Sequence, residues 1–487
     1  MMPHTDVAAL LPILLPCAGG IWILLQVALM QRRTLRAGAA LALLFLGCSA
    51  AATVMLLGRG APGELLAGAL LVDGRALAFH LVFVAVATLT VLVSIAQLES
   101  ADAAHGEFYA LLLFAVAGMT IMASSENLLT LFLGLEVLSI PLYALAGFTR
   151  DKVYSIEAAL KYFLLGAFST GFVLYGIALL YGSTGHLDLP GIAGAIGATG
   201  GAVDPLLLAG AALLLVGLAF KIAAVPFHFW APDVYQGALA PVAGFMATGT
   251  KAAAFAMLLR VVTVAFDAEP IRLRWVPVVS TLAVLSMLLG NLIALAQQNI
   301  KRMLAYSSIA NAGYLLVALA AVGTNGGGAA SIYFYLVIYG FMTVGAFAVA
   351  AIIARADESD QGFALTSYAG LGRRRPFLAA AMTLFMLSLT GIPPAAGFMA
   401  KFYIFRDAVR AGLIPLAAIG LLASVIGAFY YLRIVVQMYF REPAPEAGAA
   451  PLNVTTADAI ALTLAAAAIV YFGLAPSGLL NLARLAG

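Results

Sequence analysis

Four of the six lysines in this chain stand within long runs of apolar residues, and a carboxylate stands in another such run. The lysines are Lys161, Lys221, Lys251 and Lys401, and the carboxylate is Glu136. An ionised group at the centre of a membrane costs about 2.5–3.5 kcal/mol even on the mildest scales, so such residues usually face a polar interior and mark an ion or proton path. The alternative for a lysine near a helix end is that its side chain extends to the headgroups.

Glu136 and Lys251 are too deep for that alternative. Glu136 lies nine residues into "NLLTLFLGLEVLSIPLYALAGF", and Lys251 lies ten residues into "PVAGFMATGTKAAAF". Either distance is roughly 14 Å along a helix. Both residues are therefore predicted to belong to the path, and the alternative for Glu136 is a structural carboxylate that is hydrogen-bonded between helices.

Lys221 stands in "LAFKIAAVPFHFW", just before Pro226, which is expected to break its helix. Burial disfavours the charged form of a lysine, and a nearby carboxylate favours it. A movable Glu–Lys pair would therefore act as a proton switch, because the lysine releases its proton when the carboxylate moves away. Glu136 is the deep carboxylate available for that pair, although the sequence alone does not bring the two residues together.

Lys401 follows a second expected break in "GIPPAAGFMAKFYIF", where Pro393, Pro394 and Gly397 interrupt the helix. We expect Lys401 to be the positional counterpart of Lys221 and the far end of the path. Extension to the headgroups is a more serious competitor here, because Arg406 and Arg410 follow closely.

Other groups are weaker candidates. Glu157 and Lys161 are spaced i,i+4 on one helical face, which suits a structural ion pair and an entrance relay equally well. His228 titrates in a useful range but is as readily a packed, hydrogen-bonded residue. The stretch "YSSIANAGY" after Lys301 and Arg302 offers hydroxyls and an amide that could line a water path, or could simply join helices.

The scaffold for these groups must be a membrane protein. Of the 487 residues 64% are hydrophobic and 10% charged, and the mean hydropathy is +1.05, which excludes a soluble globular protein. Apolar runs of about 20 residues recur without the alternation of a membrane β-barrel. We predict an all-α polytopic membrane protein with about fourteen transmembrane helices.

Two of the apolar runs, 205–236 and 376–410, are too long for one straight crossing, and each contains a breaker. A pair of interrupted helices in corresponding positions indicates a transporter built from inverted repeats. The breaks fall in spans 7 and 12, which predicts two inverted five-helix repeats, spans 4–8 and 9–13. The expected divisions are residues 1–107 (helices 1–3), 108–264 (first repeat), 265–440 (second repeat) and 441–487 (loop and helix 14).

Basic residues favour an orientation in which both termini lie on the outer side of the membrane. In that orientation the cytoplasmic loops hold most of the arginines and lysines, namely Arg32, Arg33, Arg36, Arg150, Lys152, Lys301, Arg302, Arg355, Arg373, Arg374, Arg375 and Arg441. Five arginines crowd the other face, namely Arg260, Arg272, Arg274, Arg406 and Arg410.

Cofactor chemistry is not expected in this chain. Cys17 and Cys48 lie in apolar runs without partners spaced for a metal or iron–sulfur site. The sequence contains no phosphate-binding loop and no dinucleotide fingerprint.

Four stretches together resemble the antiporter-like membrane subunits of respiratory complex I, the NADH:quinone oxidoreductase, and subunit N of the bacterial enzyme in particular. They are "LFLGLEVLSIPLYALAGF", "SIEAALKYFLLGAFSTGFVLYGIALLYGSTG", "FKIAAVPFHFWAPDVYQGALAPVAGFMATGTKAAAF" and "SLTGIPPAAGFMAKFYIF". The related subunits L and M differ from this chain. Subunit L carries a long C-terminal lateral helix, and subunit M typically has a glutamate at the position of Lys401. Both L and M usually have a Trp–Glu pair where this chain has Leu135–Glu136.

The resemblance implies fourteen helices, a hydrated polar axis at mid-membrane, and a proton relay made of Glu136, Lys221, Lys251 and Lys401. It also implies a bacterial inner-membrane location beside other membrane-arm subunits, including a neighbouring antiporter-like subunit, and lipids. Flavin, iron–sulfur clusters and the quinone site would belong to partner subunits. The open alternatives are a subunit of a multi-subunit cation/proton antiporter and a structural membrane scaffold.

Overall fold

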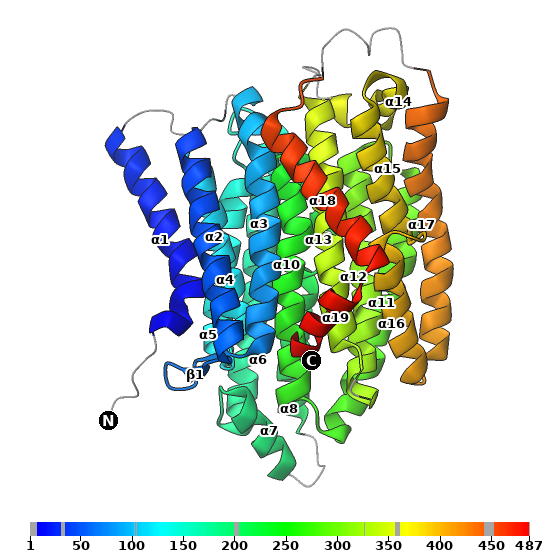
Figure 1. Ribbon diagram of the computed structural model, residues 1–487. Helices are drawn as coiled ribbons and strands as arrows, with labels where there is room; N and C mark the ends of the chain where they lie inside the picture. The colour runs from blue at the N-terminus through cyan, green and yellow to red at the C-terminus, as the bar shows by residue number, and fades with distance from the viewer. Residues whose placement is uncertain are drawn as a thin grey trace.

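The computed structural model describes residues 7–30, 35–101, 103, 105–198, 204–325, 327–355, 361–442 and 452–486, which form one bundle of nearly parallel helices (Figure 1). Within these ranges, twelve helices are long and apolar enough to cross a membrane. They are α1 (Val7–Met30), α2 (Leu35–Arg59), α3 (Gly74–Ser100), α4 (Glu107–Ser124), α5 (Leu128–Ala146), α6 (Val153–Thr184), α10 (Ala240–Arg260), α11 (Glu269–Ala296), α12 (Ile300–Asn325), α13 (Ala329–Ala354), α17 (Ile414–Phe440) and α18 (Thr456–Leu474).

The two overlong apolar runs are each divided into a pair of shorter helices. The first pair is α8 (Pro205–Lys221) and α9 (Trp230–Gly237), and the second is α15 (Pro376–Thr390) and α16 (Ala396–Arg410). Proline cannot donate the backbone hydrogen bond that a continuous helix needs, and Pro226, Pro393 and Pro394 all lie between the paired helices. Gly397, in contrast, is the second residue of α16 rather than part of the gap.

Polar side chains and one glycine define where several of these helices begin or end. Asp73, Asn127 and Asp204 accept backbone hydrogen bonds at the starts of α3, α5 and α8, which satisfies amide groups that have no partner within the helix. Thr455 and Asp458 form a reciprocal capping box at the start of α18. Gly391 ends α15 at φ +89°, a backbone conformation that side chains other than glycine rarely adopt.

Several small elements were not predicted from the sequence. The strands β1 (Gly63–Leu65) and β2 (Leu70–Val72) form an antiparallel hairpin, and α7 (Leu189–Ala198) lies beyond the end of α6. A π-helical turn, η1 (Val261–Ala265), continues α10. Short helical segments complete the chain: η2 (Gln361–Phe363), η3 (Leu365–Tyr368), α14 (Leu371–Arg374), α19 (Ser477–Ala483) and η4 (Arg484–Ala486).

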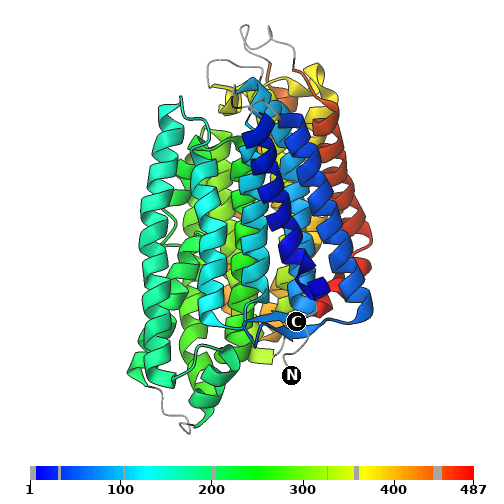
Figure 2. The same cartoon turned by 90° about the vertical axis from the view of Figure 1, so that its left-hand side faces the viewer.

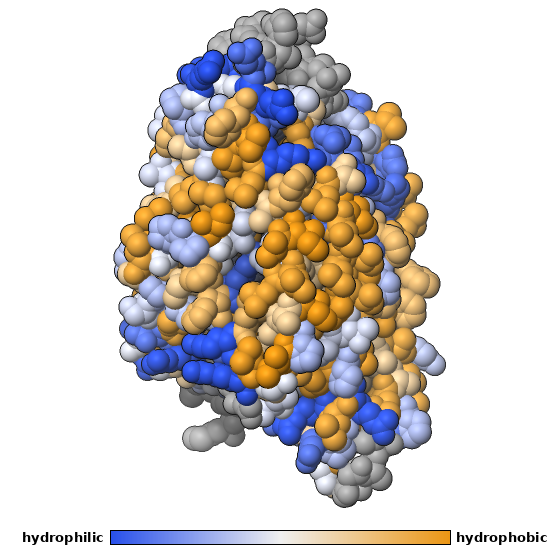
Figure 3. Space-filling view, turned by 90° about the vertical axis from the view of Figure 1, so that its right-hand side faces the viewer, coloured by the Kyte–Doolittle hydropathy of each residue, from blue (hydrophilic) through white to orange (hydrophobic). Residues whose placement is uncertain are grey.

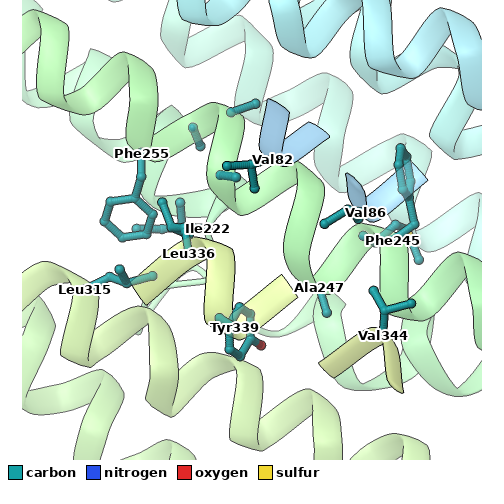
Figure 4. Close-up of a cluster of buried hydrophobic side chains, with 14 of the residues drawn as sticks. Val82, Val86, Ile222, Phe245, Ala247, Phe255, Leu315, Leu336, Tyr339 and Val344 are labelled. Atoms are coloured by element: carbon teal, nitrogen blue, oxygen red, sulfur yellow. The ribbon is translucent and has the colours of Figure 1, made fainter. Parts of the chain in front are cut away.

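Helix α10 is the centre of the bundle. Its crossing segment is buried along its whole length, and it packs against α3, α4, α12 and α13. Figure 4 shows this core, where Phe245 and Phe255 of α10 face α3, α12 and α13. In contrast, α1 and α2 lie at the periphery (Figure 2). A hydrophobic belt at mid-height lies between hydrophilic ends (Figure 3), as expected of a surface in contact with lipid.

Arg260, at the end of α10, is a buried tie between three elements. Its guanidinium donates to the Asp73 carboxylate (2.8 Å) and to the Ala123 carbonyl oxygen (3.1 Å), and only 2% of its side chain is exposed. Asp73 also caps α3. The sequence had grouped Arg260 with the arginines that crowd one face, and the structure shows it joining α3, α4 and α10.

Candidate functional site

Lys221 is the last residue of α8, and its side chain leaves the break toward α5 and α6. Its ammonium donates to the Ser139 hydroxyl (2.8 Å) and to the Tyr162 hydroxyl (3.4 Å). The nitrogen lies 5.5 Å from the centre of the Tyr162 ring, and the residue is 4% exposed. The charge is therefore held by neutral oxygens and by the face of an aromatic ring.

Glu136 lies one helical turn before Ser139 on α5, and no salt bridge joins it to Lys221 among the described residues. Glu136 still interacts electrostatically with the Lys221 ammonium. Its Oε1 atom is buried without a hydrogen-bond partner in the described structure. The expected pair is thus close but not in contact, and Ser139, which sequence reasoning missed, takes the direct position.

Aromatic rings enclose Lys221 on the side of α9. The Tyr162 ring stacks on that of Trp230 (4.7 Å between centroids, 13° between planes). The Trp230 indole in turn donates to the Phe220 carbonyl oxygen (3.1 Å). Tyr143 meets Tyr162 edge to face at 4.8 Å. Trp230 is 2% exposed and packs around the break.

Lys251 is buried near the middle of α10, and 1% of it is exposed. Its ammonium donates to the Ser308 carbonyl oxygen of α12. The Tyr235 and Tyr339 hydroxyls lie beside the Ser308 hydroxyl, but none of the three has a hydrogen-bond partner among the described residues. Buried polar groups without protein partners are the usual sites of internal water.

Lys401 lies in α16 and turns back to the end of α15. Its ammonium donates to the carbonyl oxygens of Leu389 and Thr390 (both 2.9 Å) and to the Ser424 hydroxyl (2.8 Å). The end of a helix carries partial negative charge, which favours an ammonium there. A cavity of about 570 Å³ lies beside Lys401 between α16 and α17.

The two break lysines are not equivalent in the fold. Lys221 precedes its break as the last residue of α8, whereas Lys401 follows its break as the sixth residue of α16. The expectation that Lys401 is the positional counterpart of Lys221 is therefore wrong, and Thr390 holds the matching place at the end of α15. Both ammonium groups nevertheless lie at the ends of the first half-helices.

Glu157 and Lys161 do form the expected ion pair, at 2.6 Å, and belong to a larger network. Lys161 also contacts Asp233 (2.7 Å), which contacts Arg302 (2.7 Å). The network ties α6 to the short helix α9 and to α12. Its side chains are between 29% and 58% exposed, so these charges are far more accessible than Lys221, Lys251 and Lys401.

His228 lies within the first break and is 7% exposed. Its ring contacts that of Phe229 (4.6 Å), and Nδ1 is buried with no partner in the described structure. The neighbouring Val225 amide donates to the Ser286 hydroxyl of α11 (2.9 Å). The break therefore contacts α11 at Val225.

The stretch "YSSIANAGY" contributes a polar cluster in α12. The Ser307 hydroxyl bonds to the Tyr431 hydroxyl of α17. The Asn311 amide donates to the Ser307 carbonyl oxygen (2.8 Å), and the Tyr335 hydroxyl donates to Asn311. These contacts join α12 to α13 and α17, and sequence reasoning saw only the α12 members.

The described residues bring together no group of three or more histidine, cysteine, aspartate or glutamate side chains suited to a metal ion. The site itself is an array of buried lysines, a buried carboxylate and hydroxyl groups.

Comparison with known proteins places this array in a family. Residues 125–427 match the family described as NADH:quinone oxidoreductase/Mrp antiporter, transmembrane. The chain is 49% identical to NADH-quinone oxidoreductase subunit N of Trichlorobacter lovleyi, over 85% of this chain and 83% of the relative. It is 46% identical to the subunit N of Mycobacterium tuberculosis, over 80% and 72% of the two chains.

Among solved structures, a chain of respiratory complex I from Thermus thermophilus with bound aureothin aligns with a TM-score of 0.80 and 38% identity, covering 96% of this chain and 98% of that one. A chain of the Mrp complex from Dietzia shares the fold at 23% identity, with a TM-score of 0.86 over 99% and 97% of the two chains. The chain belongs to the subunit N family of NADH-quinone oxidoreductase, the antiporter-like, proton-translocating membrane subunits of respiratory complex I.

Proposed function

We propose that Glu136, Lys221, Lys251 and Lys401 form the relay through which this chain moves protons. The observation that carries the proposal is that three buried ammonium groups are held by neutral oxygens alone, with no salt-bridge partner among the described residues. Desolvation strongly disfavours a buried charge that lacks a counter-ion. The balance between ammonium and neutral amine is thus easily shifted, as a proton carrier requires.

Glu136 supplies the means of shifting that balance. It is one helical turn from Ser139, whose hydroxyl accepts from Lys221, and its Oε1 is buried without a hydrogen-bond partner in the described structure. A small movement of α5 changes the distance between the carboxylate and the ammonium. Approach favours the charged lysine and retreat favours release of its proton. Redox chemistry in the partner subunits would drive this movement.

Uptake and release follow from the positions of the lysines. A polar cavity of about 370 Å³ is lined by Gln97, Lys301 and the turn 237–240. That turn is two residues from Tyr235, which neighbours Ser308 and Lys251. We infer that protons enter there, load Lys251 or Lys221, pass laterally to Lys401 and leave on the outer side.

The architecture that we propose has fourteen crossings, with α8–α9 and α15–α16 each completing one. Equivalent helices of the two halves have equivalent neighbours. Helix α4 packs against α5 and α10, and its counterpart α11 packs against α12 and α17. Helix α6 packs against α8 and α9, and its counterpart α13 packs against α15 and α16. Helix α11 is the fifth crossing after α4, so the two series run in opposite directions. This supports inverted repeats at 108–264 and 265–440, flanked by 1–107 and 441–487.

We further propose that the protein lies in the bacterial inner membrane with both termini outside. Arg150, Lys152, Lys301 and Arg355 all lie at the end of the bundle opposite to the start of α1, as that orientation requires (Figure 1). Arg32 and Arg33 lie outside the described residues. Flavin, iron–sulfur clusters and quinone would be bound by partner subunits, one of them a second antiporter-like subunit.

The relay is tested by Lys221→Ala and Glu136→Gln in the native host, with NADH-driven proton pumping measured in membrane vesicles. We expect both complexes to assemble and to keep NADH oxidation with an artificial acceptor, but to lose pumping. Glu99→Gln is the matched control, because Glu99 pairs with the exposed Arg36. Normal pumping by an assembled Lys221→Ala complex would show that the relay is wrong. Lost sodium tolerance with intact NADH oxidation would instead favour a cation/proton antiporter.

A further inference from the structure

A nearly continuous row of hydroxyl groups leads from the surroundings of Lys251 toward Lys401. It starts at Ser307, next to the residue whose carbonyl oxygen receives the Lys251 ammonium. Ser307 bonds to Tyr431, and the Tyr430 ring lies 4.3 Å from that of Tyr431. Tyr430 and Tyr431 are consecutive residues of α17.

A second row starts from Lys401. The Lys401 ammonium donates to Ser424 (2.8 Å) and lies 4.9 Å from the centre of the Tyr314 ring. Ser424 and Tyr314 therefore both lie beside the Lys401 ammonium. The two rows therefore end on Tyr430 and Tyr314, and one side chain stands between these two hydroxyl groups.

That side chain is Asn291 of α11, which is 1% exposed. Its Oδ1 accepts from the Tyr430 hydroxyl (2.9 Å), and its Nδ2 donates to the Tyr314 hydroxyl (3.2 Å). Asn291 Nδ2 also donates to the Met287 carbonyl oxygen (2.7 Å). Because a carbonyl oxygen only accepts hydrogen bonds, this contact identifies the Asn291 atom that faces Met287 as the NH₂ nitrogen and not the amide oxygen.

An amide interrupts a proton path that hydroxyl groups would carry. A hydroxyl group both accepts and donates, so it can take a proton on one side and release one on the other. The amide oxygen only accepts and the amide nitrogen only donates, so a proton that reaches Oδ1 has no exchangeable route to Nδ2. The row is joined structurally at Asn291 but is closed to protons.

We propose that Asn291 is a gate in the lateral step, keeping the Lys251 side and the Lys401 side apart until the amide moves or water replaces it. The proposal rests on the relay of the previous section. A pump needs a gate, because a continuous proton path between the uptake and release sides would dissipate the proton gradient that the complex builds.

Close helix packing holds the gate shut in this structure. A Cβ atom at Gly427 of α17 would lie 2.9 Å from the Asn291 Oδ1, and one at Gly290 would lie 2.7 Å from the Ala310 amide nitrogen of α12. The two glycines thus let α17 and α12 press against Asn291. A shift of α17, which also carries Ser424, Tyr430 and Tyr431, would open the gate and move its neighbours together.

Asn291→Asp tests the gate, because a carboxyl group of the same shape accepts and releases protons through its oxygens. In vesicles that contain the assembled complex, we expect an imposed pH gradient to collapse several-fold faster without NADH, and fewer protons to be pumped per NADH. Asn299→Asp is the matched control, since Asn299 caps α12 and aspartate also caps helices. Wild-type leak and stoichiometry in Asn291→Asp would overturn the proposal.

Tyr430→Phe provides a second test that removes a single oxygen atom. It takes away the group that donates to Asn291, so we expect pumping to fall without any leak, and the double variant Asn291→Asp/Tyr430→Phe to lose the leak. Normal pumping in Tyr430→Phe would show that protons do not pass along this row of hydroxyl groups, even if the Asn291→Asp complex did not assemble. If Lys221→Ala loses pumping while Asn291→Asp has a wild-type leak and Tyr430→Phe pumps normally, only the gate proposal is wrong. Normal pumping in Lys221→Ala would instead show that the relay proposal is wrong.

Discussion

The Lys401 ammonium donates a hydrogen bond to the carbonyl oxygen of Thr390, the last residue of α15, at 2.9 Å. Leu389 offers a second carbonyl oxygen at the same distance. The broken helix thus supplies two backbone acceptors that an unbroken helix would have used internally. The break does more than make room for a lysine, because its exposed carbonyl groups stabilise the charge.

Lys401→Met should abolish proton pumping while NADH oxidation with an artificial acceptor continues. Methionine fills similar volume but cannot carry a proton, and it leaves the carbonyl groups of Leu389 and Thr390 without their donor. Pumping in vesicles is the measurement, and Lys401→Arg is the comparison. Arginine keeps the charge but does not deprotonate in proteins, so it should also fail. Pumping by the arginine variant would mean that Lys401 need only be charged.

Ser139→Ala should reduce pumping without preventing assembly. The Ser139 hydroxyl is the nearest acceptor for the Lys221 ammonium, and a hydrogen bond to a charged group contributes about 1.5–3 kcal/mol. Loss of this hydrogen bond destabilises the ammonium form of Lys221, so a higher proton concentration is needed to protonate the lysine. The rate of pumping is measured as a function of the pH of the external medium, which in vesicles that oxidise added NADH is the side of proton uptake. Thr170→Ala, which removes an exposed hydroxyl from α6, should leave that profile unchanged.

Asp233→Asn should be more damaging than Glu157→Gln, although both carboxylates contact Lys161. Asp233 joins α9 to both Lys161 and Arg302, whereas the Glu157 contact lies within α6. If the network is a structural tie for the broken helix, Asp233→Asn should lower the thermal stability of the solubilised complex and Glu157→Gln should not. Equal losses of pumping with unchanged stability would indicate an entrance relay instead.

Arg260→Leu should destabilise the subunit by about 3–5 kcal/mol, because breaking a buried ion pair leaves its partners unsatisfied. The partners are the Asp73 carboxylate, which caps α3, and the Ala123 carbonyl oxygen. Retention of the subunit in the complex after heating is the measurement. Arg36→Leu removes a similar charge from an exposed pair and should cost no more than about 1 kcal/mol. Similar losses in the two variants would contradict the structural role of Arg260.

Sequence patterns predicted the helices and the breaks because both depend on local properties. Apolar length and the missing amide of Pro226, Pro393 and Pro394 are visible in a single segment. The hairpin of β1 and β2 and the π-helical turn η1 were missed, since pairing and helix widening depend on what lies beside them. The Glu157–Lys161 pair was predictable because its partners are four residues apart on one helix.

The sequence by itself determined that this chain crosses a membrane many times and carries Glu136, Lys221, Lys251 and Lys401 inside it, since the transfer of charge into hydrocarbon is a property of single residues. Only the tertiary structure decided their partners. The Ser139 hydroxyl accepts from the Lys221 ammonium, and Asn291 is hydrogen-bonded to both Tyr430 and Tyr314. Hydrogen bonds act over about 3 Å, so contacts between helices distant in sequence depend on packing that no single segment specifies.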